Sequence, residues 1–210
     1  MPAENTVDIA VFARAPVPGQ AKTRLIPRLG AAGAARLQRQ LTERALARAS
    51  EMPGARVTLW TTAIDDETRT LADAAGAALR LQDGRDLGAR MANAFEVTLD
   101  GTCPMLLIGT DCPAQTCDHL RAALAALQSA DAVVQPAEDG GYVLVGMNRL
   151  HRALFEQVAW GTDTVLATTR ARAADRGLRL SELPLCWDLD RADDLDRALA
   201  LGLVDLPEVQ

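Results

Sequence analysis

The chain has 210 residues, of which 49% are hydrophobic and 24% charged, a composition typical of globular proteins and not of disordered or fibrous ones. Its formal net charge of -6 argues against a general nucleic-acid binder, and no apolar run reaches the roughly 18 residues that a membrane span needs. The amino terminus lacks a signal-peptide pattern, and the 4 cysteines form no C-x-x-C pair. We therefore expect a cytoplasmic protein with reduced thiols and one domain over residues 1–210.

Apolar segments of strand length alternate with longer segments of helical periodicity. The expected strands cover 7–13, 56–62, 78–82, 104–110, 131–137, 142–147 and 178–184. The expected helices cover 34–49, 65–76, 87–99, 117–128, 162–177 and 191–202. This alternation predicts an α/β fold with three α/β/α layers, Rossmann-like, around a mostly parallel sheet. Ligands of such sheets bind beyond the carboxyl ends of the strands, where most polar clusters of this sequence fall.

The segment RAPVPGQAKTRL follows the first strand and carries Lys22, the only lysine of the chain. It lacks the glycines of a Walker A motif, so a P-loop ATPase or kinase is not expected. Gly19 permits a close backbone approach, and Arg14, Lys22 and Arg24 bring three cations to the end of the strand. Such a cluster favours a multiply charged phosphate ligand, with a surface lysine in a flexible loop as the alternative.

Carboxylates follow two further segments. Asp111 stands directly after the most apolar strand, where it suits a ligand or Mg²⁺; the alternative is a cap for a helix that starts near Pro113. Asp188 and Asp190 are two residues apart, so on an extended segment their side chains share a face. Asp190 could instead cap the last helix, an alternative that Asp188 lacks.

Three more loops carry residues of interest. The segment QDGRDLGARM, at 82–91, leads into a helix. Asp139 precedes the Gly140–Gly141 pair, which indicates a hairpin turn, a backbone that closely approaches a bound group, or both. Thr162 and the free amides of the following helix could bind an anion.

Six stretches together resemble a bacterial family: FARAPVPGQAKTRL, QDGRDLGARM, LIGTDCP, PAEDGGYVLVGM, WGTDT and DLDRADDL. They occur in the order expected of GT-A-type transferases that are related to the guanylyltransferase acting on 2-phospho-lactate and to the molybdenum-cofactor guanylyltransferases. The resemblance spans roughly residues 7 to 200 and implies a nucleotide-diphospho-sugar transferase (GT-A) fold. Prolines stand in the first loop where the relatives usually have several glycines, so a triphosphate could sit differently here.

The resemblance also implies roles for individual residues. Catalysis and phosphate binding would involve Lys22, Arg14, Arg24 and Asp111. Nucleotide contacts would come from Ala13, Gly19, Gln82, Gly84 and Gly88. Contacts to the acceptor would come from Asp139, Gly140, Gly141, Tyr142 and Thr162. A Mg²⁺ or Mn²⁺ ion would be held by Asp111 and by Asp188 or Asp190.

The expected function is Mg-dependent nucleotidyl transfer from a nucleoside triphosphate, with GTP as one option, to a small phosphorylated or hydroxyl acceptor. Pyrophosphate would leave, and no protein nucleophile is needed. The alternatives are glycosyl transfer from a nucleotide-sugar and nucleotide binding without catalysis. The expected partners are the nucleotide or nucleotide-sugar and the acceptor, bound by a monomer or homodimer, with no nucleic acid and no membrane.

Overall fold

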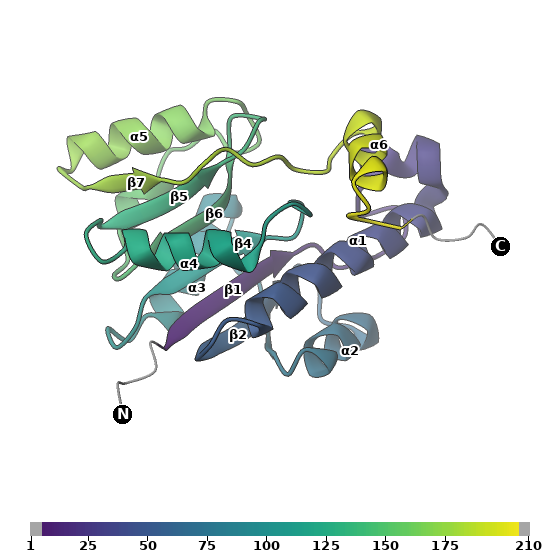
Figure 1. The fold of residues 1–210 in the computed structure, drawn as a ribbon, viewed down its shortest axis with the longest axis horizontal. Helices are drawn as coiled ribbons and strands as arrows, with labels where there is room; N and C mark the ends of the chain where they lie inside the picture. The colour runs from purple at the N-terminus through teal and green to yellow at the C-terminus, as the bar shows by residue number, and fades with distance from the viewer. Residues whose placement is uncertain (1–5, 206–210) are drawn as a thin grey trace.

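The computed structural model describes residues 6–205 and arranges seven strands in one sheet, in the order β3-β2-β1-β4-β6-β5-β7 (Figure 1). The strands are β1 (Val7–Ala13), β2 (Ala55–Thr61), β3 (Ala78–Leu81), β4 (Met105–Gly109), β5 (Ala132–Pro136), β6 (Tyr142–Met147) and β7 (Leu180–Glu182). β6 is antiparallel to β4 and β5, and the other neighbouring strands are parallel. The prediction of a mostly parallel sheet is therefore confirmed.

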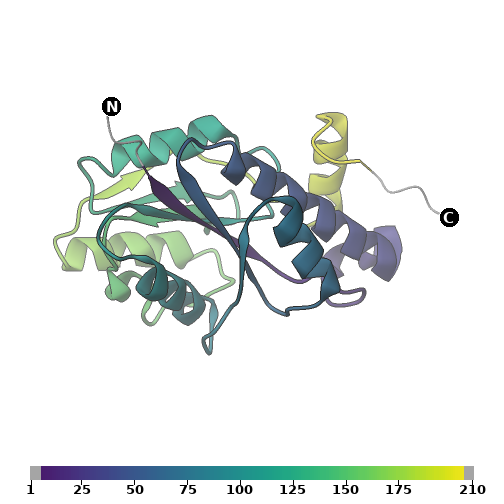
Figure 2. The same ribbon diagram turned by 90° about the horizontal axis from the view of Figure 1, so that it is seen from below.

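Helices cover both faces of the sheet, which Figure 2 shows between two helical layers. The α-helices are α1 (Ile26–Ser50), α2 (Asp66–Ala74), α3 (Leu87–Thr98), α4 (Cys117–Ala126), α5 (Val165–Asp175) and α6 (Ala192–Ala200), with short 3-10 helices η1 (Thr23–Leu25) and η2 (Arg152–Phe155). Helices α1, α2 and α4 pack on one face, and α3, η2 and α5 pack on the other.

Strand β1 shows why the strand sequences are apolar throughout. Ile9 and Val11 belong to the core under α1, α2 and α4. Ala10 and Phe12 belong to the core under α3 and α5, because successive side chains of a strand point to opposite faces. All seven residues of β1 are buried, so both faces exclude water and the expected three-layer arrangement is present.

Helix α6 lies apart from the sheet, beside the first half of α1 (Figure 1). A third apolar cluster joins Leu37 and Leu41 of α1 to Leu195 of α6, together with Trp187 and Leu189. Because Trp187 and Leu189 belong to this cluster, the packing of α6 on α1 fixes the chain segment that carries Asp188 and Asp190. Among residues 6–205, no helix is long and apolar enough to cross a membrane.

Among the element boundaries, the starts of two helices differ most from the expectations. Helix α1 begins at Ile26 instead of residue 34 and is kinked at Gly30, where φ is 68°. Helix α5 begins at Val165, so the expected helical start at 162 is wrong. Strand β6 is antiparallel because only a short turn joins it to β5, and a turn of that length connects antiparallel neighbours.

Candidate active site

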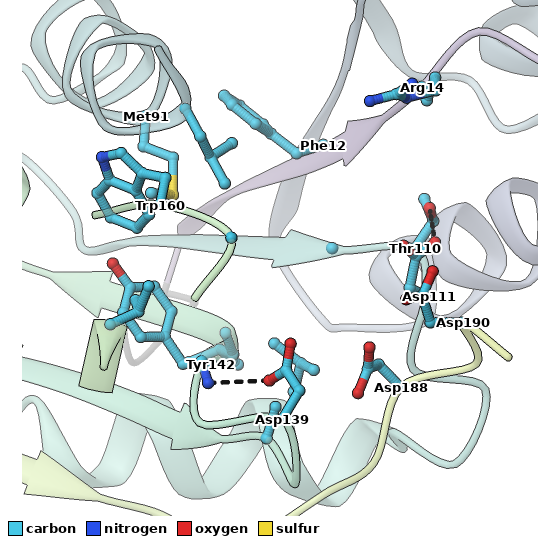
Figure 3. A pocket seen from close by; sticks show the side chains of 18 of the residues that line it. Phe12, Arg14, Met91, Thr110, Asp111, Asp139, Tyr142, Trp160, Asp188 and Asp190 are labelled. Atoms are coloured by element: carbon cyan, nitrogen blue, oxygen red, sulfur yellow. Dashed lines mark hydrogen bonds between the residues drawn. The ribbon is translucent and has the colours of Figure 1, made fainter. Parts of the chain in front are cut away.

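A cavity of about 530 Å³ opens beside the carboxyl ends of β1 and β4 (Figure 3). The loop after β1 supplies Arg14, Lys22 and Arg24, and the residues after β4 supply Asp111. Its other walls come from the β5–β6 turn, the loop before α5 and the segment before α6. Its size is in the ordinary range of small-molecule sites. The described part of the chain therefore brings together most of the loops that the sequence singled out.

Lys22 joins three of these segments. Its ammonium nitrogen lies 2.8 Å from Oδ1 of Asp111, and it donates a hydrogen bond of 2.5 Å to the carbonyl oxygen of Leu189. Only 3% of the lysine side chain is exposed, so the surrounding residues fix the position of its ammonium group. Its backbone is left-handed, with φ 47° and ψ 45°. Strained conformations of this kind in residues other than glycine are concentrated at functional sites.

The other two cations of the loop are exposed. Arg14 donates a hydrogen bond of 3.1 Å to the carbonyl oxygen of Gln20. Arg24 is paired with Asp190, the second carboxylate of the segment before α6. Lys22 and Arg24 therefore each contact a carboxylate, and an anionic ligand would have to compete with these two contacts.

Asp188 lies where several carboxylates crowd together. Burial, together with the negative charges of Asp139, Asp111 and Asp190, raises the pKa of Asp188 to about 6. Asp139 itself accepts a hydrogen bond of 2.8 Å from the backbone amide of Gly141 (Figure 3). A cation between these side chains would relieve the repulsion, and carboxylate oxygens are ligands that Mg²⁺ accepts.

The alternatives that made helix caps of Asp111 and Asp190 are wrong. Helix α4 begins at Cys117 with Thr116 as its cap, which leaves Asp111 free of that role. Helix α6 is capped at Arg191, and it is Asp194 that accepts hydrogen bonds from the amides of residues 190 and 191. Asp111 and Asp190 therefore line the cavity without capping a helix.

The loop after β4 is tied to the segment before α6 by contacts beyond that of Lys22. The backbone amide of Leu189 donates to the carbonyl oxygen of Asp111 at 2.7 Å. The buried thiols of Cys112 and Cys186 are 2.7 Å apart. All four cysteines, each within the described residues, are free, as expected. These contacts hold Asp111 and Asp188 at one wall of the cavity.

The turn between β5 and β6 is the expected hairpin, and its glycines have different surroundings. Gly140 has φ 85°, and a Cβ atom there would lie 2.2 Å from the carbonyl oxygen of Asp163. Its own carbonyl oxygen accepts a hydrogen bond of 2.9 Å from the amide of Leu166. Gly140 thus docks the turn on the start of α5, while Gly141 and Tyr142 line the cavity. One of the α5 amides proposed for an anion is occupied by this contact.

The residues expected at the nucleotide are absent from the cavity lining that residues 6–205 form, and Gly19 among them is exposed. In the described chain the cavity lining lacks Ala13, Gly19, Gln82, Gly84 and Gly88, and also Gly140 from the acceptor group. Gln82 donates to the carbonyl oxygens of Ala13 and Trp60, at 3.1 and 3.0 Å. A Cβ atom at Gly84 would lie 2.6 Å from the amide nitrogen of Arg90. These residues support the loops, and their contact with a nucleotide stays a prediction.

The apolar half of the cavity was not predicted from the sequence. This half is lined by Phe12, Leu87, Met91 and Trp160, beside Tyr142. Of these residues, Met91, Tyr142 and Trp160 lie on the side of the cavity opposite the carboxylates in Figure 3. Phe12 reads in the sequence as one more residue of a buried strand, and Met91 as one more core residue of a helix. The signal that could have found this half is Trp160, which directly precedes the GTDT motif.

This sheet order, with a cationic loop after the first strand and carboxylates after β4, defines a protein of the nucleotide-diphospho-sugar transferase fold. Residues 45–162 match the family described as "Uncharacterized protein conserved in bacteria (DUF2064)", and the chain belongs to that family. A protein of Desulfovibrio desulfuricans G20, proposed to be a nucleotide-diphospho-sugar transferase, is 30% identical over 92% of this chain and 85% of its own, with a TM-score of 0.83.

Two solved enzymes share the fold at lower identity. The inositol-1-phosphate CTP transferase of T. maritima has a TM-score of 0.66 at 13% identity, covering 95% of each chain. Glucosyl-3-phosphoglycerate synthase of Mycobacterium tuberculosis, solved with Mn²⁺ and UDP, has a TM-score of 0.57 at 11% identity, covering 97% of this chain and 81% of its own. No curated protein matches the chain. The structural neighbours are thus nucleotidyl and glycosyl transferases.

Proposed function

We propose that this protein is a Mg²⁺- or Mn²⁺-dependent nucleotidyltransferase that joins a nucleotide to a small phosphorylated or hydroxyl acceptor and releases pyrophosphate. The contact between Lys22 and Asp111, made inside a cavity at the ends of two adjacent strands, is the observation that carries the proposal. It puts a fixed ammonium beside a carboxylate, the two kinds of group that bind a phosphate and its counter-ion.

The chemistry needs positioning more than a reactive side chain. An oxygen of the acceptor attacks the α-phosphorus of a nucleoside triphosphate, and the bond to pyrophosphate breaks. Arg14, Lys22 and Arg24 bind the phosphate oxygens and stabilise the charge that builds up on the leaving group. Asp111 and Leu189 hold the Lys22 ammonium at one position of the cavity, so its place is fixed before a phosphate competes for it. Asp139 and Thr162, which also line the cavity, orient the acceptor.

A divalent ion fits the donor chemistry of the site. Asp111, with Asp188 or Asp190, would hold it. Burial and the repulsion between carboxylates, which together raise the pKa of Asp188, favour a cation there. Among residues 6–205, however, no group of three ligating side chains is assembled. Mg²⁺ commonly uses one or two carboxylates together with substrate phosphates and water, which such a site provides. When bound, the ion would neutralise phosphate charge and polarise the phosphorus centre.

Glycosyl transfer from a nucleotide-sugar is the second candidate. Lys22 and Arg24 are each paired with a carboxylate, so the cationic excess of the loop is smaller than its sequence suggests. A diphosphate-sugar needs less neutralisation than a triphosphate. The fold is also found in glucosyl-3-phosphoglycerate synthase with Mn²⁺ and UDP. Nucleotide binding without catalysis is the third possibility.

One set of assays separates the three functions. The full chain is incubated with Mg²⁺ or Mn²⁺, each of the four nucleoside triphosphates and a panel of phosphorylated and hydroxyl acceptors, and pyrophosphate is measured. Parallel reactions contain UDP-glucose and GDP-mannose, with free nucleoside diphosphate as the readout. Acceptor-dependent pyrophosphate that is lost in Asp111→Asn supports the proposal. Release of nucleoside diphosphate favours glycosyl transfer, and binding without either product favours the non-catalytic function.

A further inference from the structure

The cavity has two chemically different halves. One half carries the cations of the β1 loop and the carboxylates Asp111, Asp139, Asp188 and Asp190. The other half, which we call the apolar wall, is formed by Phe12, Leu87, Met91, Tyr142 and Trp160 (Figure 3). A ligand that fills the whole cavity must therefore be polar at one end and apolar at the other.

The apolar wall is built into the fold. The rings of Tyr142 and Trp160 meet edge to face, with centroids 6.2 Å apart and planes at 88°. Trp160 lies directly against the first turn of α3, since a Cβ atom at Gly88 would be 2.5 Å from the indole Nε1. Only a residue without a side chain allows this contact. The position of the indole is therefore set by close packing before any ligand binds.

The apolar wall offers few hydrogen bonds. In the described chain, the side chains of the apolar wall consist of aromatic rings, methyl groups and a thioether. Their only nitrogen and oxygen atoms are the indole nitrogen of Trp160 and the hydroxyl oxygen of Tyr142. That hydroxyl is buried, with almost no accessible surface, so a ligand in the cavity meets the tyrosine ring and not its oxygen. The hydroxyl groups of a sugar would lose their hydrogen bonds to water here without replacing them.

Leu87 shows that apolar surface is left uncovered. It is the first residue of α3, lines the cavity and is 44% exposed. Met91, one helical turn further on, lines the same half and has an adaptable, polarizable side chain. A ligand that covers Leu87 would remove its apolar surface from water, which favours an apolar group at this end. Met91 is only 3% exposed, so it adds a contact surface to the cavity and little newly buried area.

We propose that the apolar wall binds the acceptor, and that the acceptor is an amphiphile whose phosphate or hydroxyl points to the charged half while an aromatic or branched aliphatic body lies on the wall. This inference rests on the proposed function, because the acceptor is defined by that reaction. Tyr142 and Trp160 are close in the chain to Asp139 and Thr162, which the proposed function assigns to the acceptor and which line the same cavity. The aromatic pair therefore continues the acceptor side of the cavity.

Calorimetric titration of the full chain tests the inference. The probes, all in Mg²⁺, are phenyl phosphate, glucose 1-phosphate, GTP and CTP. We expect phenyl phosphate to bind at least ten-fold more tightly than glucose 1-phosphate. Leu87→Ser should weaken the binding of phenyl phosphate at least five-fold and leave the affinities for glucose 1-phosphate and the nucleotides unchanged. Leu201→Ser is the matched control, since Leu201 is an exposed leucine outside the cavity lining given by the described residues.

The inference would be overturned by equal or tighter binding of glucose 1-phosphate, by no binding of phenyl phosphate, or by no effect of Leu87→Ser on the binding of phenyl phosphate. Equal weakening of nucleotide binding by Leu87→Ser would also overturn it, because the base would then occupy the apolar wall. If the full chain bound neither nucleotide but its binding of phenyl phosphate still depended on Leu87, the proposed function would be refuted. The cavity would then remain a site for an apolar ligand.

Discussion

The ammonium of Lys22 and the carboxylate of Asp111 are 2.8 Å apart, although they follow different strands of the sheet. The two strands, β1 and β4, are hydrogen-bonded neighbours, so the loops at their carboxyl ends meet. From the sequence, Lys22 was expected to bind phosphate and Asp111 to bind a divalent ion, and the structure pairs the two groups directly. The pair orients both side chains toward the cavity.

Removing the lysine should reduce turnover far more than stability. We expect Lys22→Ala to lower nucleotidyl transfer by ~10²–10³-fold, the usual effect of losing a preorganised charge. Unfolding should become easier by only about 1–3 kcal/mol, because the carbonyl oxygen of Leu189 loses its donor while half-exposed Asp111 is hydrated again. Steady-state rates and thermal unfolding measure the two effects. Near-normal turnover in the folded variant would refute the role of Lys22.

Asp188 should make the metal-free protein less stable as the pH rises. Its pKa in the folded chain is about 6, above the ordinary 3.8, so the folded state binds the proton more tightly than the unfolded state. The stabilising contribution is therefore complete below about pH 4 and is lost between pH 4 and 6. We expect Asp188→Asn to remove this loss and to raise the free energy of unfolding at pH 7 by on the order of 1 kcal/mol. This is less than the whole pKa shift would give, because the half-buried carboxylate is partly screened by water.

Thermal unfolding at pH 4.5 and pH 7, with and without Mg²⁺, measures the contribution of Asp188. Mg²⁺ should stabilise the wild-type chain at pH 7 more than it stabilises Asp188→Asn. A variant that is less stable than the wild type at pH 7 without metal would contradict the crowding of carboxylates.

Gly140 and Gly19 provide a matched pair for the β5–β6 turn. Both have φ near 80°, at 85° and 80°, but a Cβ atom at Gly140 would lie 2.2 Å from the carbonyl oxygen of Asp163, whereas one at Gly19 meets nothing within 4 Å. Gly19→Ala should therefore cost about 1 kcal/mol, the strain of a left-handed backbone alone. Gly140→Ala should cost at least about 3 kcal/mol, since two backbone segments must separate. Equal midpoints in denaturant unfolding would show that the turn can move away from α5.

Arg24 should contribute to ligand binding and little to stability. Its pair with Asp190 is solvent-exposed, with 65% and 34% of the two side chains accessible, and such pairs contribute about 0–1 kcal/mol. We expect Arg24→Ala to weaken GTP binding about ten-fold, the effect of losing one charge-assisted phosphate contact of roughly 1.4 kcal/mol. Arg28→Ala is the control, because Arg28 forms a similar exposed pair with Asp196 and lies outside the cavity lining given by residues 6–205. Equal nucleotide affinities in the two variants would remove Arg24 from the site.

Local pattern was sufficient for the strands and for the place of the site. Val7–Ala13 is apolar along its whole length because both faces of β1 are buried, and this run is visible without a structure. The polar loops that follow 13 and 110 lie at the same edge of the sheet because parallel neighbours end there. The antiparallel β6 was implicit in the short turn before Tyr142.

The geometry of the site depended on the order of strands in space. Sequence periodicity reports which face of an element is buried, but not which element covers it. Nothing in the local pattern around Trp160 indicates that it packs on Gly88, or that Phe12 and Met91 share a cavity with it. The raised pKa of Asp188 likewise depends on carboxylates from three separate segments.

The sequence by itself determined the alternation of strands and helices and the loops in which charged residues gather, because burial periodicity and turn residues act over a few neighbouring positions. Only the tertiary structure decided that Lys22 contacts Asp111, that α6 fixes the segment of Asp188, and that an apolar wall faces the charges. These features arise where segments distant in the chain pack together, and the energy of such contacts depends on distance and burial in space.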